Sequence, residues 1–288
     1  MTDSPTPRLA LATSAEHAEL HPHDLPLADA LREAGLHPIA EAWTDPSVDW
    51  SSYDAVLLRS VQDHHSRYDE FTDWLGLLDQ AGVPVLNDSD LVRWNGDKRY
   101  LLELRERGVA IVPSQVAAGA CLREVVAGLD GHEIVIKPTI SATTSPTVRG
   151  TAGSESLSRA MDELPDAVYL VQLFQPEIQA DGEWSLTFID GRFSHAVVRR
   201  ATGDDIVRQS LGGSDEPTEP LAVVLAGATA ALAALDTRMP PVYARVDGIV
   251  TGGRFLLTEL GLIEPNLNLS TSPAATTRLA TAVAARLN

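Results

Sequence analysis

The chain has 288 residues, enough for one large α/β unit or two to three small subdomains. Its formal net charge of −18 repels nucleic acid and anionic membranes, so we expect neither as a partner. A single cysteine, Cys121, excludes an internal disulfide. No signal sequence and no apolar run long enough to span a membrane is present, so we expect a cytoplasmic protein.

The first 88 residues alternate strand-like and helix-like segments. Short apolar runs predict strands, whereas apolar residues at helical spacing followed by a glycine predict helices. We predict helices over 24–36 and 67–82, and strands over 8–14, 37–43, 55–60 and 83–87. This alternation predicts a small parallel sheet with helices on its faces.

From about residue 88 the sequence changes character. Asp190-Gly191 lies between two β-rich runs, which predicts a hairpin over 183–200 because both turn positions tolerate a positive φ. Cys121, early in a predicted helix, is expected to be a small packing residue. We predict helices over 90–108, 121–130, 154–164, 219–236 and 273–287, and further strands over 133–138, 167–174, 242–250 and 254–266.

Two histidine-containing segments are candidates for a polar site. His21, His23 and Asp24 could offer ligands to a metal, but a polar loop that caps the following helix is the simpler interpretation. His64 and His65 follow the C-terminal end of a predicted strand, the edge at which ligands bind in open α/β sheets. The sequence leaves open whether they contact a substrate or form a solvated turn.

Two lysines differ from ordinary surface cations. Lys98 follows Asp97 near a predicted helix start, and Lys137 ends the apolar strand EIVIK. An ammonium group at the end of a buried strand must meet an anion or water. A lysine that extends to the surface is the alternative interpretation.

Oxygen ligands from two predicted strands form a candidate magnesium site. Arg245 and Asp247 are two residues apart and therefore project from one face, and Glu264 and Asn266 likewise share a face. Mg²⁺ prefers such oxygens together with phosphate oxygens. Glu259 has the opposite strand parity, so we place it outside this site unless a bulge intervenes. A structural ion pair of Arg245 with Asp247 or Glu264 is the alternative.

Several stretches, in their order and spacing, resemble the ATP-grasp superfamily over nearly the whole chain. Within it, the resemblance is to proteins similar to cycloserine synthetase. The stretches are DPSVDW, VLLRS, DLVRWNGDKRYL, VIKP, GEWSLTFIDGRFSHAVVRR, GGS, YARVDG and ELGLIEPNLNL.

The resemblance implies a combined α/β and α+β fold of the ATP-grasp type. An N-terminal parallel-sheet domain, residues 1–88, would lie on the substrate side. Two α+β subdomains, residues 89–172 and 173–288, would enclose ATP, and the second would carry the metal site.

The resemblance also implies roles for individual residues. Lys98 and Lys137 would contact the phosphates of ATP, and Arg245 would stabilise the phosphate during transfer. Arg199 and Arg208 are further candidates for phosphate or substrate contact.

The remaining implied residues bind the nucleoside and the metal. Glu183 would hold the ribose hydroxyls. The adenine hinge would comprise Gln172, Leu173, Phe174 and Gln175. The Mg²⁺ ligands would be Asp247, Glu264 and Asn266.

The implied activity is that of an ATP- and Mg²⁺-dependent ligase. A small amino-acid-like carboxylate, or a similar carbonyl oxygen, would become an acylphosphate, and an amine or a cyclising nucleophile would then displace phosphate. One departure concerns the loop TISATTSPTVRG, which has no glycine before Gly150 and carries Pro146. A nucleotide-binding protein without turnover and a small-molecule kinase therefore stay open as alternative functions. The oligomeric state also stays open, and a homodimer is one possibility.

Overall fold

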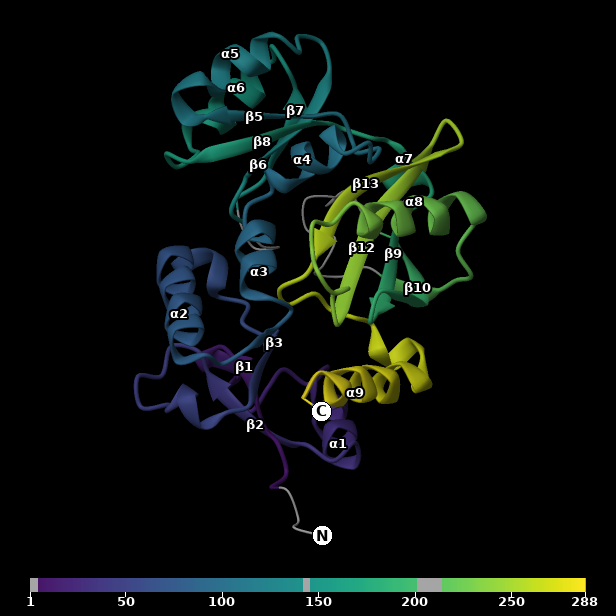
Figure 1. The fold of residues 1–288 in the computed structure, drawn as a ribbon. Coiled ribbons are helices and arrows are strands. Elements are labelled where there is room, and N and C mark those ends of the chain that lie inside the picture. The colour runs from purple at the N-terminus through teal and green to yellow at the C-terminus, as the bar shows by residue number, and fades with distance from the viewer. Residues whose placement is uncertain (1–4, 142–145, 201–213, 288) are drawn as a thin grey trace.

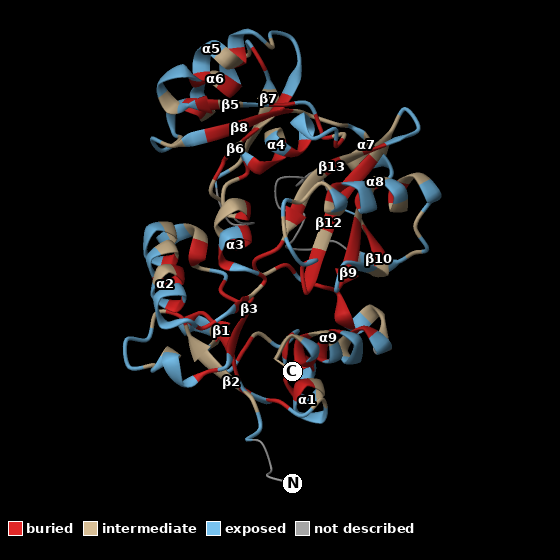
Figure 2. Cartoon of the chain, in the orientation of Figure 1, coloured by how far each residue is buried: buried red, intermediate tan, exposed pale blue. Residues whose placement is uncertain are grey.

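Three β-sheets organise the part of the chain that the structure describes (Figure 1). The structure is a computed structural model, and it describes residues 5–141, 146–200 and 214–287. Within these residues no helix has both the length and the apolar character needed to cross a membrane. Buried residues concentrate on the strands and on the helix faces that cover them (Figure 2).

The N-terminal sheet is parallel, in the order β2-β1-β3-β4, as predicted. Successive side chains of a strand face opposite sides. Leu9 and Leu11 therefore pack with α1 and α9, whereas Ala10 and Ala12 pack with α2 on the other face. The elements are β1 (Arg8–Thr13), α1 (Leu25–Glu33), β2 (His37–Ala42), β3 (Ala55–Ser60), α2 (Tyr68–Ala81), β4 (Val85–Leu86) and the C-terminal α9 (Pro273–Leu287).

Two short helices, α3 (Ser89–Asn95) and α4 (Tyr100–Glu106), replace the single helix predicted over 90–108. Gly96 follows α3 and lies against the Tyr68 ring, where an added Cβ would be 2.6 Å away. The Lys98 backbone N–H donates to the Thr139 carbonyl at 2.8 Å instead of to a helical carbonyl. The prediction was wrong because a glycine and this long-range bond interrupt the helix, and the break places Lys98 between the two helices.

The second sheet is antiparallel, in the order β5-β8-β6-β7. Ile134 and Ile136 pack against α5 and α6, which leaves Val135 and Lys137 on the opposite face. Cys121 is exposed before α5, so its predicted packing role was wrong. The elements are β5 (Ser114–Ala118), α5 (Leu122–Ala127), β6 (Glu133–Pro138), β7 (Val148–Thr151), α6 (Glu155–Asp162) and β8 (Val168–Leu173).

The third sheet, in the order β11-β10-β9-β12-β13, contains the predicted hairpin. Asp190 and Gly191 both have positive φ values at its turn, 49° and 71°. Leu186 and Phe188 pack against α4 and α8, whereas Ser185 lies on the other face. The elements are α7 (Glu177–Ala180), β9 (Glu183–Ile189), β10 (Arg192–Arg200), β11 (Ser214–Pro217), α8 (Ala222–Ala233), β12 (Tyr243–Thr251) and β13 (Arg254–Gly261).

The chain crosses between these sheets more than once. Helix α4 follows the N-terminal sheet but packs on the third sheet, and α9 returns from the third sheet to α1. The predicted division into residues 1–88, 89–172 and 173–288 stays a prediction.

Candidate active site

A cavity of about 680 Å³ is lined by residues from all three sheets. Its walls include the strand faces that do not pack against helices. All the predicted site residues within the described chain line it, and Arg208 lies outside the described residues. The predicted residues that line the cavity are Lys98, Lys137, Gln172, Leu173, Phe174, Gln175, Glu183, Arg199, Arg245, Asp247, Glu264 and Asn266.

Lys98 and Lys137 are the only lysines in the sequence, and both line this cavity. The Lys98 Nζ donates to the Ser141 carbonyl at 2.6 Å and lies 3.6 Å from the Glu259 Oε1. Burial lowers the pKa of Lys137, and the nearby Lys98 lowers it further. Two compact cations that line one cavity favour an anionic ligand such as a phosphate.

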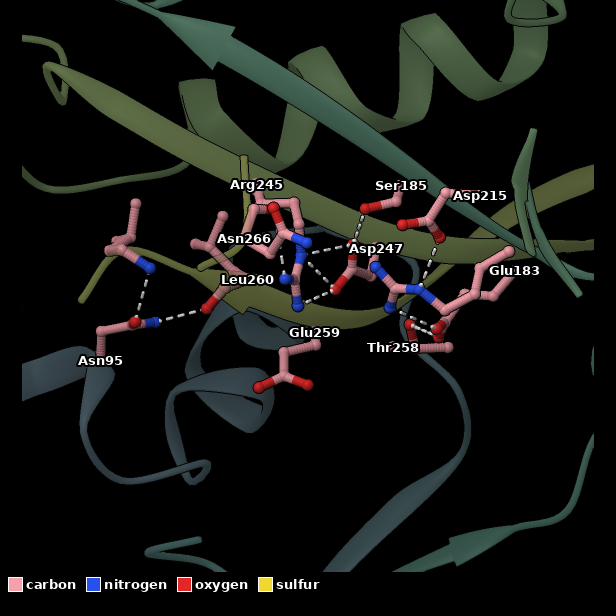
Figure 3. Close-up of polar contacts among 12 residues, drawn as sticks. Asn95, Glu183, Ser185, Asp215, Arg245, Asp247, Thr258, Glu259, Leu260 and Asn266 are labelled. Carbon is pink, nitrogen blue, oxygen red and sulfur yellow. Dashed lines mark hydrogen bonds and ion pairs between the residues drawn. The ribbon is translucent and has the colours of Figure 1, made fainter. Parts of the chain in front are cut away.

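Arg245 and Asp247 share a face of β12, as their spacing predicted, and form an ion pair (Figure 3). The Arg245 Nη2 lies 2.7 Å from the Asp247 Oδ2, and the Arg245 Nε lies 3.0 Å and 2.9 Å from the two oxygens. The Ser185 hydroxyl donates to the Asp247 Oδ1 at 2.6 Å. The ion pair between Arg245 and Asp247, which the sequence left open as an alternative to a magnesium site, is therefore present. It holds the buried Asp247 carboxylate in the cavity wall.

Glu259 lies opposite Asp247 in the β12–β13 register, because the register shifts between Asp247 and Gly248. Directly paired residues of antiparallel strands project from the same face. Burial raises the pKa of Glu259, but Lys98, Lys137 and Arg245 outweigh it and lower the pKa to about 2. The expectation that Glu259 faces elsewhere was therefore wrong, because a bulge intervenes. The bulge that returns it to this face has no sequence signal beyond the adjoining Gly248.

Glu264 and Asn266 lie in the loop after β13, because that strand ends at Gly261 and not at residue 266 as predicted. A shared strand face therefore cannot bring them together. The exposed Asn266 accepts the Asn268 backbone N–H through its Oδ1 at 3.0 Å. Among the described residues, no group of three or more His, Cys, Asp or Glu side chains could hold a metal. Glu264 and Asn266 as Mg²⁺ ligands stay a prediction.

Glu183 is buried beside Arg199, its partner in the β9–β10 register. Its Oε1 accepts the Thr258 hydroxyl at 2.6 Å, and its Oε2 lies 3.8 Å from the Arg199 Nη1 (Figure 3). Burial, with Asp247 adding to it, raises the pKa of Glu183 to about 6. The carboxylate lies in the cavity wall, where a ligand's hydroxyl groups could reach it.

The predicted hinge already uses part of its backbone hydrogen bonding. The Leu173 N–H donates to the Pro113 backbone carbonyl at 3.0 Å, and the Phe174 N–H donates to the Glu133 backbone carbonyl at 2.8 Å. The Arg149 guanidinium lies 3.6 Å from the centroid of the Phe174 ring. Arg149 was not among the sequence candidates, because nothing in the sequence connects a position on β7 with one after β8.

The N-terminal sheet contributes a polar wall at the C-terminal ends of its strands. Asp24 is the buried N-cap residue of α1, but its side chain makes no capping hydrogen bond; its Oδ1 accepts from the Arg59 Nε at 3.0 Å and from the Arg59 Nη2 at 2.9 Å. His64 is buried and, like His65, lines the cavity, which favours the ligand-contacting interpretation of that segment over a solvated turn. Arg59 was missed, although a lone arginine in the apolar strand AVLLRS is a visible signal.

The comparisons with known proteins agree with this arrangement. The family described as "D-cycloserine synthetase DcsG, N-terminal domain" matches residues 9–87. The cycloserine biosynthesis protein DcsG of Streptomyces lavendulae is 32% identical over 299 residues, which cover 97% of this chain and 98% of that protein. The chain belongs to the D-cycloserine synthetase DcsG family.

Solved structures agree with membership of the DcsG family. The crystal structure of D-cycloserine synthetase DcsG matches with a TM-score of 0.83 and 30% identity, over 98% of this chain and 100% of that one. The ATP-grasp ligase PsnB, complexed with minimal precursor, Mg and ADP, matches with a TM-score of 0.66 and 15% identity, over 100% and 99%. This second likeness concerns the fold alone, and it confirms the predicted ATP-grasp fold.

Proposed function

We propose that the chain is an ADP-forming ligase that uses ATP to activate the carboxylate of a small amino-acid-like substrate. The observation that carries this proposal is the convergence of Lys98, Lys137 and Arg245 with two facing carboxylates in one cavity. Phosphoryl transfer depends on positioning and on neutralising charge, which these cations supply without a dedicated base. Membership of the DcsG family supports a ring-closing or amide-forming reaction.

The proposed reaction has two steps. A substrate carboxylate oxygen attacks the γ-phosphorus, the bond to the β–γ bridging oxygen breaks, and ADP leaves with that electron pair. A substrate amine then attacks the acyl carbon, inorganic phosphate leaves, and the amine loses a proton. Lys98 and Lys137 would neutralise the phosphates, and Arg245 would stabilise the transferring group.

The donor set fits a magnesium ion that arrives with the nucleotide. Asp247 and Glu259 offer carboxylate oxygens from paired positions of two strands, and Mg²⁺ typically takes one or two carboxylates together with substrate phosphates. These two residues would hold the ion, and Glu264 and Asn266 stay the candidates from the sequence. A bound Mg²⁺ supplies charge neutralisation on the phosphate oxygens. In this structure Asp247 pairs with Arg245 and Glu259 pairs with Lys98, and these two cations would also contact the phosphates.

The test is a nucleotide assay with a panel of free amino acids and diamines, ATP and MgCl₂. We expect amino-acid-dependent release of ADP and inorganic phosphate in equal amounts, together with a condensed or cyclised product by mass spectrometry. Release of AMP and pyrophosphate would contradict the acylphosphate route. A stable phosphorylated product would indicate a kinase, and Mg·ATP binding without turnover on any substrate would indicate a nucleotide-binding protein.

A further inference from the structure

Glu264 is a carboxylate without a partner in a rigid setting. It lines the cavity, and within the described chain no hydrogen bond or ion pair reaches its oxygens. The residues on both sides of it are fixed. The Ile263 carbonyl accepts from the Tyr243 hydroxyl at 2.6 Å, and the Pro265 carbonyl accepts from the Arg59 Nη2 at 3.2 Å. The backbone on both sides of Glu264 is therefore fixed, whereas its carboxylate has no partner among the described residues.

The two arginines close enough to act electrostatically on Glu264 already form ion pairs with other carboxylates. Arg245 pairs with Asp247 at 2.7 Å, and Arg59 pairs with Asp24 at 2.9 Å. Burial raises the pKa of Glu264 to about 7, although Arg245 and Arg59 both lower it, and neither arginine forms an ion pair with it. A cavity-lining carboxylate whose neighbouring cations form ion pairs elsewhere is suited to a cation that the ligand brings.

Two kinds of ligand cation are possible, a metal ion and an ammonium group. A protein-held metal needs several ligands, and within the described residues no group of three or more His, Cys, Asp or Glu side chains is placed to hold one. The paired carboxylates Asp247 and Glu259 adjoin the lysines, whereas Glu264 follows the strand and adjoins the Asp24–Arg59 wall. An ammonium group, in contrast, can be bound by a single carboxylate through a charge-assisted hydrogen bond.

We propose that Glu264 binds the α-ammonium group of the substrate and not the Mg²⁺ ion for which the sequence made it a candidate, with Arg59 acting as the positioning residue that fixes its loop. This inference rests on the proposed function and adds a selection rule to it. The site accepts amino acids and discriminates against carboxylic acids of the same shape that lack the ammonium group. An amino acid anchored at Glu264 leaves its carboxylate free for the phosphate-binding end of the cavity.

The test compares wild-type protein with Glu264→Gln, which removes the charge at constant shape, and with Glu264→Asp, which keeps it. Glu33→Gln, an exposed change at the end of α1, is the matched control. Calorimetry would measure the binding affinities of D-serine and D-alanine and compare them with those of 3-hydroxypropanoate and propanoate, with a non-hydrolysable ATP analogue and Mg²⁺ present. The KM values for amino acid, ATP and Mg²⁺ would be measured for each variant that turns over.

We expect Glu264→Gln to weaken amino-acid binding by about tenfold to a hundredfold, the value of a charge-assisted hydrogen bond, with the KM for ATP unchanged. The preference for amino acids over the acids without nitrogen should disappear in Glu264→Gln and persist in Glu264→Asp. An unchanged amino-acid affinity, or a raised Mg²⁺ requirement in its place, would overturn the inference. Wild-type turnover on a carboxylic acid without an ammonium group would overturn it too, while leaving the proposed ligase intact.

Discussion

Asp247 on β12 and Glu259 on β13 are directly paired across the two strands, at the one position where their register shifts. The pairing places two carboxylates on the face that also presents Arg245. Lys98 reaches Glu259 from the break between α3 and α4. Opposite charges from three segments of the chain therefore meet in the cavity wall.

Replacing Glu259 by Gln should reduce turnover by about a hundredfold to a thousandfold, the usual effect of removing one electrostatic contact to a transferring group. The Mg²⁺ concentration for half-maximal rate should rise, because one of two facing carboxylates is lost. Asp247→Asn should lose at least as much. The measurement is steady-state ADP release at varied MgCl₂, with Glu33→Gln as the control. A wild-type Mg²⁺ dependence in Glu259→Gln would exclude it from the metal site.

Lys137→Ala should abolish turnover while leaving the fold intact, because its ammonium is held in the cavity and its apolar neighbours Ile134 and Ile136 pack without it.

Lys98 and Lys137 are the only lysines in the sequence, so amine acetylation can be mapped to two side chains and the N-terminus. Mg·ATP should protect both side chains from acetylation, but not the N-terminal amine. Equal labelling with and without nucleotide would argue against phosphate contact by either lysine.

The ATP-grasp fold and most of the cavity-lining residues followed from the family resemblance, whereas local patterns predicted several individual elements. Strand alternation identified the N-terminal sheet, and Asp190-Gly191 identified the hairpin. The spacing of Arg245 and Asp247 correctly placed them on one face of a strand. Each of these depends only on residues close together in the chain.

The errors have a common physical origin in interactions between distant segments. The break near Lys98 depends on the Thr139 carbonyl, and the position of Glu259 depends on a register shift between two strands. The end of β13 at Gly261 likewise moved Glu264 off the strand. A parity rule applied to one strand cannot account for a bulge or an early strand end.

His64 should make the protein sensitive to mild acid. It is buried, and burial lowers its pKa from 6.5 to about 4. The neutral form is favoured in the fold, so its contribution to stability is complete above pH 6.5 and is lost as the pH falls toward 4. Between pH 7 and 4.5, wild type should lose about 2–3 kcal/mol more stability than His64→Gln.

Urea denaturation at several pH values, followed by circular dichroism, measures this difference. His132→Gln, at an exposed histidine, should keep the wild-type pH dependence. Parallel curves for wild type and His64→Gln would show that the buried histidine does not titrate in this range.

Asn87 should be essential for attaching the N-terminal sheet to the third sheet. Its buried side chain donates to the Tyr243 and Leu262 carbonyls, each at 2.9 Å, and accepts the Val242 N–H at 2.7 Å. Asn87→Ala leaves these three backbone groups unpaired, and each buried group costs about 1–3 kcal/mol. We expect a loss of about 3 kcal/mol or more in the free energy of unfolding.

Asn87→Asp separates hydrogen bonding from packing at this position. The aspartate keeps the volume and can still accept from Val242, but it cannot donate to Tyr243 or Leu262 when ionised. It should therefore lose stability comparably to Asn87→Ala in urea denaturation at pH 7. A near wild-type stability for Asn87→Asp, with a large loss for Asn87→Ala, would assign the effect to side-chain volume and not to the two donated bonds.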